Sequence, residues 1–196
     1  MADVDTDLML RVAAGDDGAF ETLVGRVLPR LMGYLRRLGA DRTEAEDLAQ
    51  EVLVKVYRAR AKYVARARFV TYLFHVARNH WIDLYRHRRS SPLPLSVDRL
   101  RDDPDGGSIA ARIEGRAGFD PVKGADEREA REGIGRAIER LGPEHREVFL
   151  LAQVEGLRYQ EIGEILGVPV GTVKSRMHAA VRQLREALLR EGIEPP

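Results

Sequence analysis

The residues best suited to chemistry are hydrogen-bond donors gathered near the C-terminus. They lie between apolar residues that recur at the helical period, and they are Thr172, Lys174, Ser175, Arg176, His178 and Arg182. Ammonium, guanidinium, hydroxyl and imidazole groups bind phosphates and the edges of bases. Because these donors share one face of a predicted helix, the pattern favours a nucleic-acid-binding surface. A helical hairpin with a solvated basic face is the alternative explanation.

Two short helices and a tight turn must position these donors. Ile162, Ile165 and Leu166 predict the first helix, and Gly167 with Pro169 predicts the turn. We expect Gly163 to permit close approach of the two helices. Thr172 and Ser175 should open the second helix, whose predicted buried residues are Val170, Val173, Met177, Ala180, Val181 and Leu184. This order of elements is typical of a helix-turn-helix that enters the DNA major groove.

A second basic segment covers residues 55–89, with ten basic side chains and one acidic side chain. Seven of the chain's twelve aromatic residues lie within 57–85. Cations bind phosphates and aromatic rings stack on unpaired bases, so this mixture suits single-stranded or locally opened DNA. We expect Phe69 and Trp81 in the core, with Tyr63 and Tyr72 open to either role. Asn79 adds a neutral amide that can donate to and accept from a base edge.

Composition narrows the class of protein. The 196 residues carry a net charge of +1 and include no cysteine, which excludes a disulfide framework and a Cys-ligated metal centre. The acidic N-terminus differs from a secretory signal, and no apolar run reaches the roughly 18 residues that span a bilayer. We therefore expect a cytoplasmic protein with no membrane insertion, no metal and no cofactor.

Helical periodicity predicts an all-α fold. Residues 7–37 form two helices broken at 15–18, with Asp17 as N-cap of the second. Thr43 and Glu46 predict a capping box for a helix over 44–60, and a further helix covers 69–87. The Pro- and Gly-rich segment predicts a flexible linker over 90–126, with a short helix near 108–116. Two small helical domains, 1–89 and 127–196, would flank this linker.

Six short strings, in order along the chain, resemble the sigma-70 family. They are Gly15-Asp16 with Ala19-Phe20, AEDLAQEV at 45–52, TYLFHVARN at 71–79, LGPEHREVF at 141–149, YQEI at 159–162 and GTVKSR at 171–176. More narrowly, the chain is similar to extracytoplasmic-function (ECF) sigma factors, which keep only regions 2 and 4. That resemblance implies a factor that binds core RNA polymerase and directs promoter-specific transcription initiation, without being an enzyme.

The resemblance also implies roles for particular residues. Asp47, Gln50 and Glu51 match the helix that binds the β′ clamp, and region 4 would dock on the β flap. The residues implied at the −10 element are Arg60, Lys62, Tyr63, Arg66, Arg68, Tyr72, Arg78 and Asn79. Those implied at the −35 element are Arg158, Tyr159, Thr172, Lys174, Ser175, Arg176, His178 and Arg182. An anti-sigma factor is a further partner that the family implies.

One departure from the family and two other classes of protein bear on this interpretation. The loop before Phe69 lacks the family's usual glycine and acid, and Tyr72 replaces the usual Trp. The base preference of the family at the −10 element therefore cannot be transferred to this chain.

A polymerase-independent helix-turn-helix regulator would explain the C-terminal module alone. A metal-dependent nuclease would need His75, His80 and His87, or Glu161 and Glu164, as ligands. Because His75 and His80 diverge around a helix, the pattern disfavours that enzyme.

Overall fold

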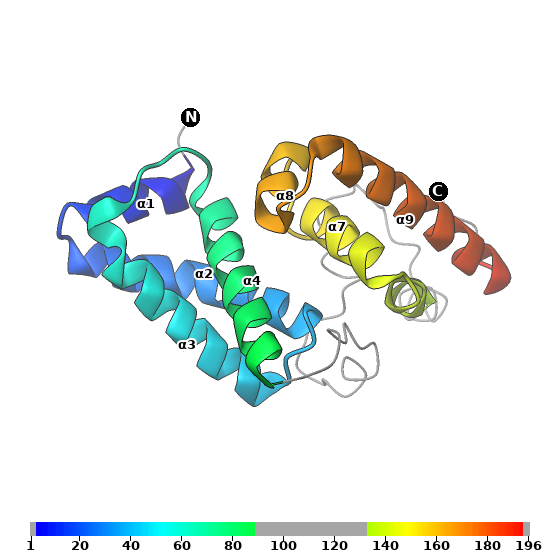
Figure 1. The fold of residues 1–196 in the computed structure, drawn as a ribbon, viewed down its shortest axis with the longest axis horizontal. Coiled ribbons are helices and arrows are strands. Elements are labelled where there is room, and N and C mark those ends of the chain that lie inside the picture. The colour runs from blue at the N-terminus through cyan, green and yellow to red at the C-terminus, as the bar shows by residue number, and fades with distance from the viewer. Residues whose placement is uncertain (1–2, 89–132, 194–196) are drawn as a thin grey trace, which may run out of the picture. The chain divides into compact units, whose positions relative to one another are not determined.

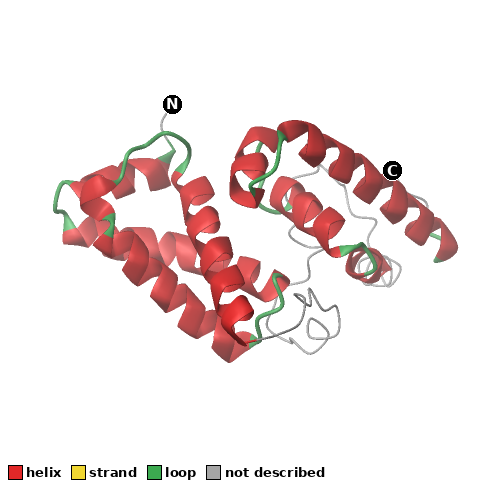
Figure 2. Cartoon of the chain, in the orientation of Figure 1, coloured by secondary structure: helices red, strands yellow, loops and turns green. Residues whose placement is uncertain are grey.

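The computed structural model describes residues 3–88 and 133–193, and within these ranges every regular element is a helix (Figure 2). The predicted all-α class is therefore confirmed. The chain divides into two compact units, one carrying α1 to α4 and the other carrying α7 and α9 (Figure 1). The predicted linker over 90–126 and the short helix near 108–116 lie outside the described residues.

The N-terminal unit is a bundle of four helices. They are α1 (Val4–Ala13), α2 (Asp17–Arg37), α3 (Arg42–Arg58) and α4 (Phe69–Arg88), with a single 3₁₀ turn, η1 (Arg60–Lys62), after α3. Each helix turns one apolar stripe inward, and the largest fully buried side chains include Tyr34, Phe69, Phe74, Leu31 and Leu73. The rings of Tyr34 and Phe74 stack with their centroids 4.7 Å apart, joining α2 to α4.

The cap of α2 differs from the prediction. Asp16, not Asp17, is the N-cap residue, and its Oδ1 accepts a hydrogen bond from the backbone N–H of Ala19 at 2.9 Å. Arg11 also donates to the Asp16 carboxylate, at 2.6 Å. These two contacts, the Ala19 hydrogen bond first, lower the pKa of Asp16. Asp17 is the first helical residue instead.

The cap of α3 also lies earlier than predicted. Asp41 Oδ1 accepts from the backbone N–H of Glu44 at 2.9 Å, and Glu44 Oε2 accepts from the N–H of Asp41 at 3.2 Å. This reciprocal pair is a capping box, so the predicted box of Thr43 and Glu46 was wrong. Because Asp41 already caps this helix, α3 begins at Arg42 and Thr43 lies inside its first turn.

Within the described residues, the C-terminal unit has a helix over 133–139, followed by α7 (Pro143–Gln153), α8 (Tyr159–Leu166) and α9 (Val170–Arg190). Gly142 is the N-cap residue of α7 and Pro143 is its first helical residue, where a proline is tolerated. Residues from the first helix, α7 and α9 share one core: Ala137, Ile138, Leu141, Leu150, Val154, Ala180, Leu184, Ala187 and Leu188. This packing holds α9 along its apolar stripe.

A tight turn joins α8 to α9. Gly167 adopts the left-handed conformation, with φ +67°, and the N–H of Val168 donates to the carbonyl of Gly163 at 3.0 Å. A Cβ atom at Gly163 would lie 2.9 Å from the carbonyl oxygen of Val168 and would also touch Val170. The expected close approach at Gly163 is therefore present, and its tightest contact is with the backbone of the turn.

Two expectations for α9 were wrong. The helix begins at Val170 with Pro169 as N-cap, so Thr172 and Ser175 lie inside it, and Ser175 Oγ donates to the carbonyl of Thr172 at 2.9 Å. Val181 was expected in the core but is 50% exposed. The buried stripe is made instead by Val173, Met177, Ala180 and Leu184.

Candidate nucleic-acid and polymerase interfaces

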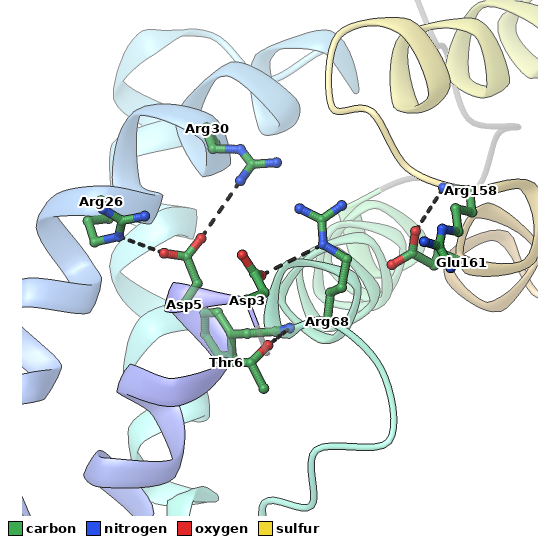
Figure 3. A network of polar contacts seen from close by, with 9 residues as sticks. Asp3, Asp5, Thr6, Arg26, Arg30, Arg68, Arg158 and Glu161 are labelled. Carbon is green, nitrogen blue, oxygen red and sulfur yellow. Dashed lines mark hydrogen bonds and ion pairs between the residues drawn. The ribbon is translucent and has the colours of Figure 1, made fainter. Parts of the chain in front are cut away.

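The loop between η1 and α4, residues 63–68, carries the cations of the first candidate interface. Arg66 and Lys62 are exposed, whereas Arg68 lies with its Nε 3.7 Å from Asp3 Oδ2 (Figure 3). The first turn of α1 also holds the end of the loop, because Thr6 Oγ1 accepts a hydrogen bond from the backbone N–H of Phe69 at 2.9 Å. The loop is thus a cationic segment with one end anchored in the bundle.

Three aromatic rings lie beside this loop. Tyr63 and Tyr72 meet edge to face at 5.5 Å, and Tyr63 is 6.1 Å from the ring of Phe69. Phe69 is fully buried, as predicted, and Trp81 is 4% exposed. Both tyrosines are half-buried, and burial raises the pKa of Tyr63 and the pKa of Tyr72. They are neutral phenols at the rim of the core, between the buried Phe69 and the exposed loop.

Asn79 lies on an exposed face of α4, two turns beyond Tyr72. Its side-chain nitrogen donates to Nε2 of His75 at 3.2 Å, one turn back along the same face. Arg78 is half-buried beside it. Sequence reasoning did not assign His75 to this surface, although its spacing of four residues from Asn79 could have indicated the contact.

Arg60 is held differently from the other predicted −10 cations. Its guanidinium lies over the ring of Tyr57, 3.9 Å from the centroid, and donates to the carbonyl of Tyr57 at 3.0 Å. Tyr57 in turn donates to Asp17 Oδ1 at 2.8 Å, which raises the pKa of Tyr57. Arg60 therefore serves the structure of the η1 turn. A phosphate contact would have to share it with Tyr57.

The outer face of α3 is the second candidate interface. Asp47, Gln50 and Glu51 are all exposed, and Val54 continues the same face with 46% of its surface exposed. Polar and acidic groups around one exposed apolar side chain are the mixture found at protein–protein interfaces, whose rims are polar. The structure thus brings together the three residues that the sequence assigned to polymerase binding.

Sequence reasoning missed the residue that links this face to α4. His80 is 8% exposed, and its ring nitrogens lie 2.5 Å from Glu51 Oε2 and 2.6 Å from Lys55 Nζ. The sequence had suggested His80 only as a metal ligand.

Glu161, another suggested ligand, caps α8 by accepting from the backbone N–H of Arg158 at 2.7 Å. Among the described residues, no group of three acidic, His or Cys side chains could hold a metal ion.

The helix-turn-helix presents the third candidate interface on α9. Lys174, His178 and Arg182 are exposed at successive turns, and Ser175 is exposed beside them. Arg176 differs, because its guanidinium pairs with Glu144 of α7 at 2.6 Å and its side chain is 22% exposed. Thr172 is half-buried. The exposed stripe is therefore Lys174, His178 and Arg182, while Arg176 also ties α9 to α7.

The two residues predicted ahead of α9 lie at the start of α8. Arg158 is exposed as the N-cap residue, and Tyr159, the first helical residue, is half-buried. Helix N-termini present backbone N–H groups that attract phosphates, so both positions suit contacts to the phosphate backbone of DNA.

None of the helices within 3–88 and 133–193 has the length and apolar character needed to cross a membrane.

Comparisons with known proteins agree with this architecture. The chain matches the family models "Sigma-70 region 2" over residues 23–91 and "Sigma-70, region 4" over residues 131–184. It is 33% identical to the RNA polymerase sigma factor CarQ of Myxococcus xanthus, across 92% of this chain and 95% of that protein. It is 31% identical to the ECF RNA polymerase sigma factor SigW of Bacillus subtilis, across 91% and 93%.

A solved structure is also similar. The structure of CnrH in complex with the cytosolic domain of CnrY matches with a TM-score of 0.63 and 26% identity, covering 96% of this chain and 99% of that one. The chain belongs to the sigma-70 family and, within it, to the ECF sigma factors. It is thus a transcription initiation factor of that family, as the resemblance of its motifs indicated.

Proposed function

We propose that this chain binds core RNA polymerase through α3 and opens promoter DNA at the −10 element with α4 and the loop before it. The observation that carries the proposal is the placement of two different surfaces on one four-helix unit. The α3 face is acidic and neutral, with Asp47, Gln50 and Glu51 exposed, whereas the loop and α4 are cationic and aromatic. A protein and a polyanion would be bound on chemically distinct surfaces.

The −10 role rests on Asn79 and the residues of the loop. Extruding a base from the duplex costs a few kcal/mol of stacking, which contacts to the extruded base must offset. Tyr63 and Tyr72 supply ring edges, Asn79 supplies an amide, and Lys62 and Arg66 supply exposed cations for the adjoining phosphates. We assign Arg60, Arg68 and Arg78 supporting roles, because Arg60 already contacts Tyr57, Arg68 lies 3.7 Å from Asp3 and Arg78 is half-buried.

The −35 role rests on α9. Lys174, His178 and Arg182 would face the major groove, with Ser175 and Thr172 near its edge and Arg158 and Tyr159 on the backbone. The same unit would dock on the β flap of the polymerase. CnrH was solved in complex with the cytosolic domain of CnrY, and we extend the expectation of a protein partner to this chain. The family resemblance implies that this partner is an anti-sigma factor.

Chemistry in this scheme belongs to the polymerase, so we assign the chain no catalytic step and place it in the cytoplasm with that enzyme. Run-off transcription with purified core polymerase on pooled genomic promoters tests the proposal. Transcripts that start at defined points only when the protein is added would support it. Tight binding of the free protein to particular duplexes, without new transcripts, would favour a polymerase-independent regulator instead.

A further inference from the structure

His80 joins the two helices that carry the proposed polymerase and −10 surfaces. It is a residue of α4, it is 8% exposed, and both of its ring nitrogens contact side chains of α3. Nε2 lies 2.5 Å from Glu51 Oε2, and Nδ1 lies 2.6 Å from Lys55 Nζ. The two α3 residues are four apart, so they lie on adjacent turns, and the imidazole bridges them.

Hydrogen-bond chemistry determines the form of the imidazole in this network. The Lys55 ammonium has no acceptor, so Nδ1 must accept from it. Nε2 then carries the proton and donates to the Glu51 carboxylate. A neutral imidazole in this tautomer satisfies both partners, whereas a doubly protonated ring would turn an N–H toward the ammonium. Lys55 therefore donates a hydrogen bond to the neutral imidazole, and the imidazole donates one to the Glu51 carboxylate.

The network constrains side chains that would otherwise be mobile. A flexible glutamate or lysine side chain loses rotamer entropy when it becomes ordered in a protein–protein interface, and this loss lowers the affinity. Glu51 keeps 57% of its side chain exposed while His80 holds one of its oxygens, so the carboxylate stays accessible to a basic partner. Gln50 and the exposed Val54 lie on the same face. Because His80 already orders Glu51 and Lys55 in the free protein, less rotamer entropy is lost when the α3 face binds its partner.

We propose that His80 is a positioning residue for polymerase docking, acting by holding Glu51 and Lys55 in their docking geometry. The inference rests on the proposed function, because it takes α3 as the polymerase-binding face. It goes beyond that function by assigning a role to a buried residue of α4 that need not touch the polymerase. Since His80 directly follows Asn79, one turn of α4 serves both the DNA surface and the polymerase surface.

The test is the affinity of the full chain for core RNA polymerase in the absence of DNA. His80→Leu should weaken binding roughly 2- to 10-fold for each side chain it releases. His80→Gln, which can still accept from Lys55 and donate to Glu51, should bind more tightly than His80→Leu. Thr22→Val is the control. It removes an exposed side-chain hydrogen bond within α2 of the same unit, away from the α3 face, and polymerase affinity should not change.

A double-mutant comparison separates positioning from a general loss of structure. In a Glu51→Ala, Lys55→Met background both hydrogen-bond partners of His80 are absent, so His80→Leu should cause no further loss of affinity. An equal loss in both backgrounds would overturn the inference. If His80→Leu fails to give a cooperative melting curve, Lys55→Met alone decides, because it removes one arm of the network at an exposed position. Unchanged affinity for that variant would also overturn it.

Gln50→Ala distinguishes failure of the inference from failure of the proposed function. Gln50 lies on the same face and is no part of the His80 network. If Gln50→Ala weakens binding and His80→Leu does not, the docking face stands and the positioning role is wrong. If Gln50→Ala and Glu51→Gln both bind as tightly as the unaltered chain, α3 is not the docking face and the inference falls with it.

Discussion

The hydroxyl oxygen of Thr6 in α1 accepts a hydrogen bond from the backbone N–H of Phe69, the first residue of α4, at 2.9 Å. The first N–H groups of a helix have no partner within it, so Thr6 caps α4 from a distant part of the chain. Thr6 is 7% exposed and Phe69 is fully buried. The residues matched by the region 2 family model begin at 23, so α1 lies outside them, yet it holds the end of the loop over 63–68.

Thr6→Val tests this contact. Valine keeps the shape of threonine but cannot accept, so the buried N–H of Phe69 loses its partner, at a cost of about 1–3 kcal/mol in the free energy of unfolding. Trp81 is the single tryptophan of the chain and is buried in α4, so urea denaturation followed by its fluorescence reports on this unit. Thr22→Val is the control.

Thr22 bonds only within its own helix, through Oγ1 to the carbonyl of Gly18, and it is exposed. Its substitution should change the unfolding free energy by less than about 0.5 kcal/mol. Equal effects of the two substitutions would show that the contact between Thr6 and Phe69 contributes nothing particular to the stability of α4.

Gly163→Ala should destabilise the helix-turn-helix. The new Cβ would lie 2.9 Å from the carbonyl oxygen of Val168, and a backbone atom in a tight turn cannot move aside easily. Overpacking of this kind costs about 1–3 kcal/mol. Gly171→Ala is the matched control, because no heavy atom lies within 4 Å of its Cβ position.

For Gly171, alanine should leave stability unchanged or raise it by up to about 1 kcal/mol, since it lowers the entropy of the unfolded chain. Circular dichroism during thermal unfolding measures both variants. A lower melting temperature for Gly171→Ala than for Gly163→Ala would contradict the assignment of the close contact to Gly163.

Local patterns predicted most of this fold, and the misses arise either from a choice between similar neighbours or from contacts distant in the sequence. The turn at Gly167 was predicted because the conformation that it requires is a local property of glycine. The cap of α2 was misplaced by one residue, because Asp16 and Asp17 are chemically identical neighbours and only the backbone distinguishes them. The contacts of His80 with α3 were not predicted, because its partners Glu51 and Lys55 lie 29 and 25 residues away.

The candidate site shows the same limit. Spacing on α9 predicted the exposed stripe of Lys174, His178 and Arg182, because the helical period decides which side chains share a face. It could not show that Arg176 pairs with Glu144, a residue of α7. A periodic pattern gives the face of a helix but not which of its charges are already bound to another helix.

Asn79→Ala should impair open-complex formation more than closed-complex binding. The amide is exposed on α4 and would contact a base only after the duplex opens, whereas the proposed phosphate contacts of the exposed Lys62 and Arg66 would form earlier. Loss of one base contact lowers open-complex formation roughly tenfold. Permanganate reactivity of unpaired thymines measures opening, and retardation of the polymerase complex on duplex DNA measures closed binding. Equal losses in the two assays would count against a role in melting.

Lys174→Ala should weaken transcription from promoters that contain a −35 element and spare templates that do not need one. Lys174 is exposed on α9, and the loss of a base contact costs about 1–3 kcal/mol of binding at the affected position. Competition between promoters with and without the element, at constant salt, measures this difference. A uniform loss on both would reduce Lys174 to a phosphate contact, since phosphates carry no sequence information.

Arg176→Ala needs a different comparison, because it removes both a cation and the ion pair with Glu144 at 2.6 Å. Glu144→Gln breaks the same pair and leaves the guanidinium in place. If Arg176 contacts DNA, Arg176→Ala should weaken binding to the −35 element while Glu144→Gln binds equally well or more tightly, because the arginine is released toward DNA. If both variants lose affinity to the same extent, the ion pair serves to hold α9 against α7, and Arg176 acts by positioning α9.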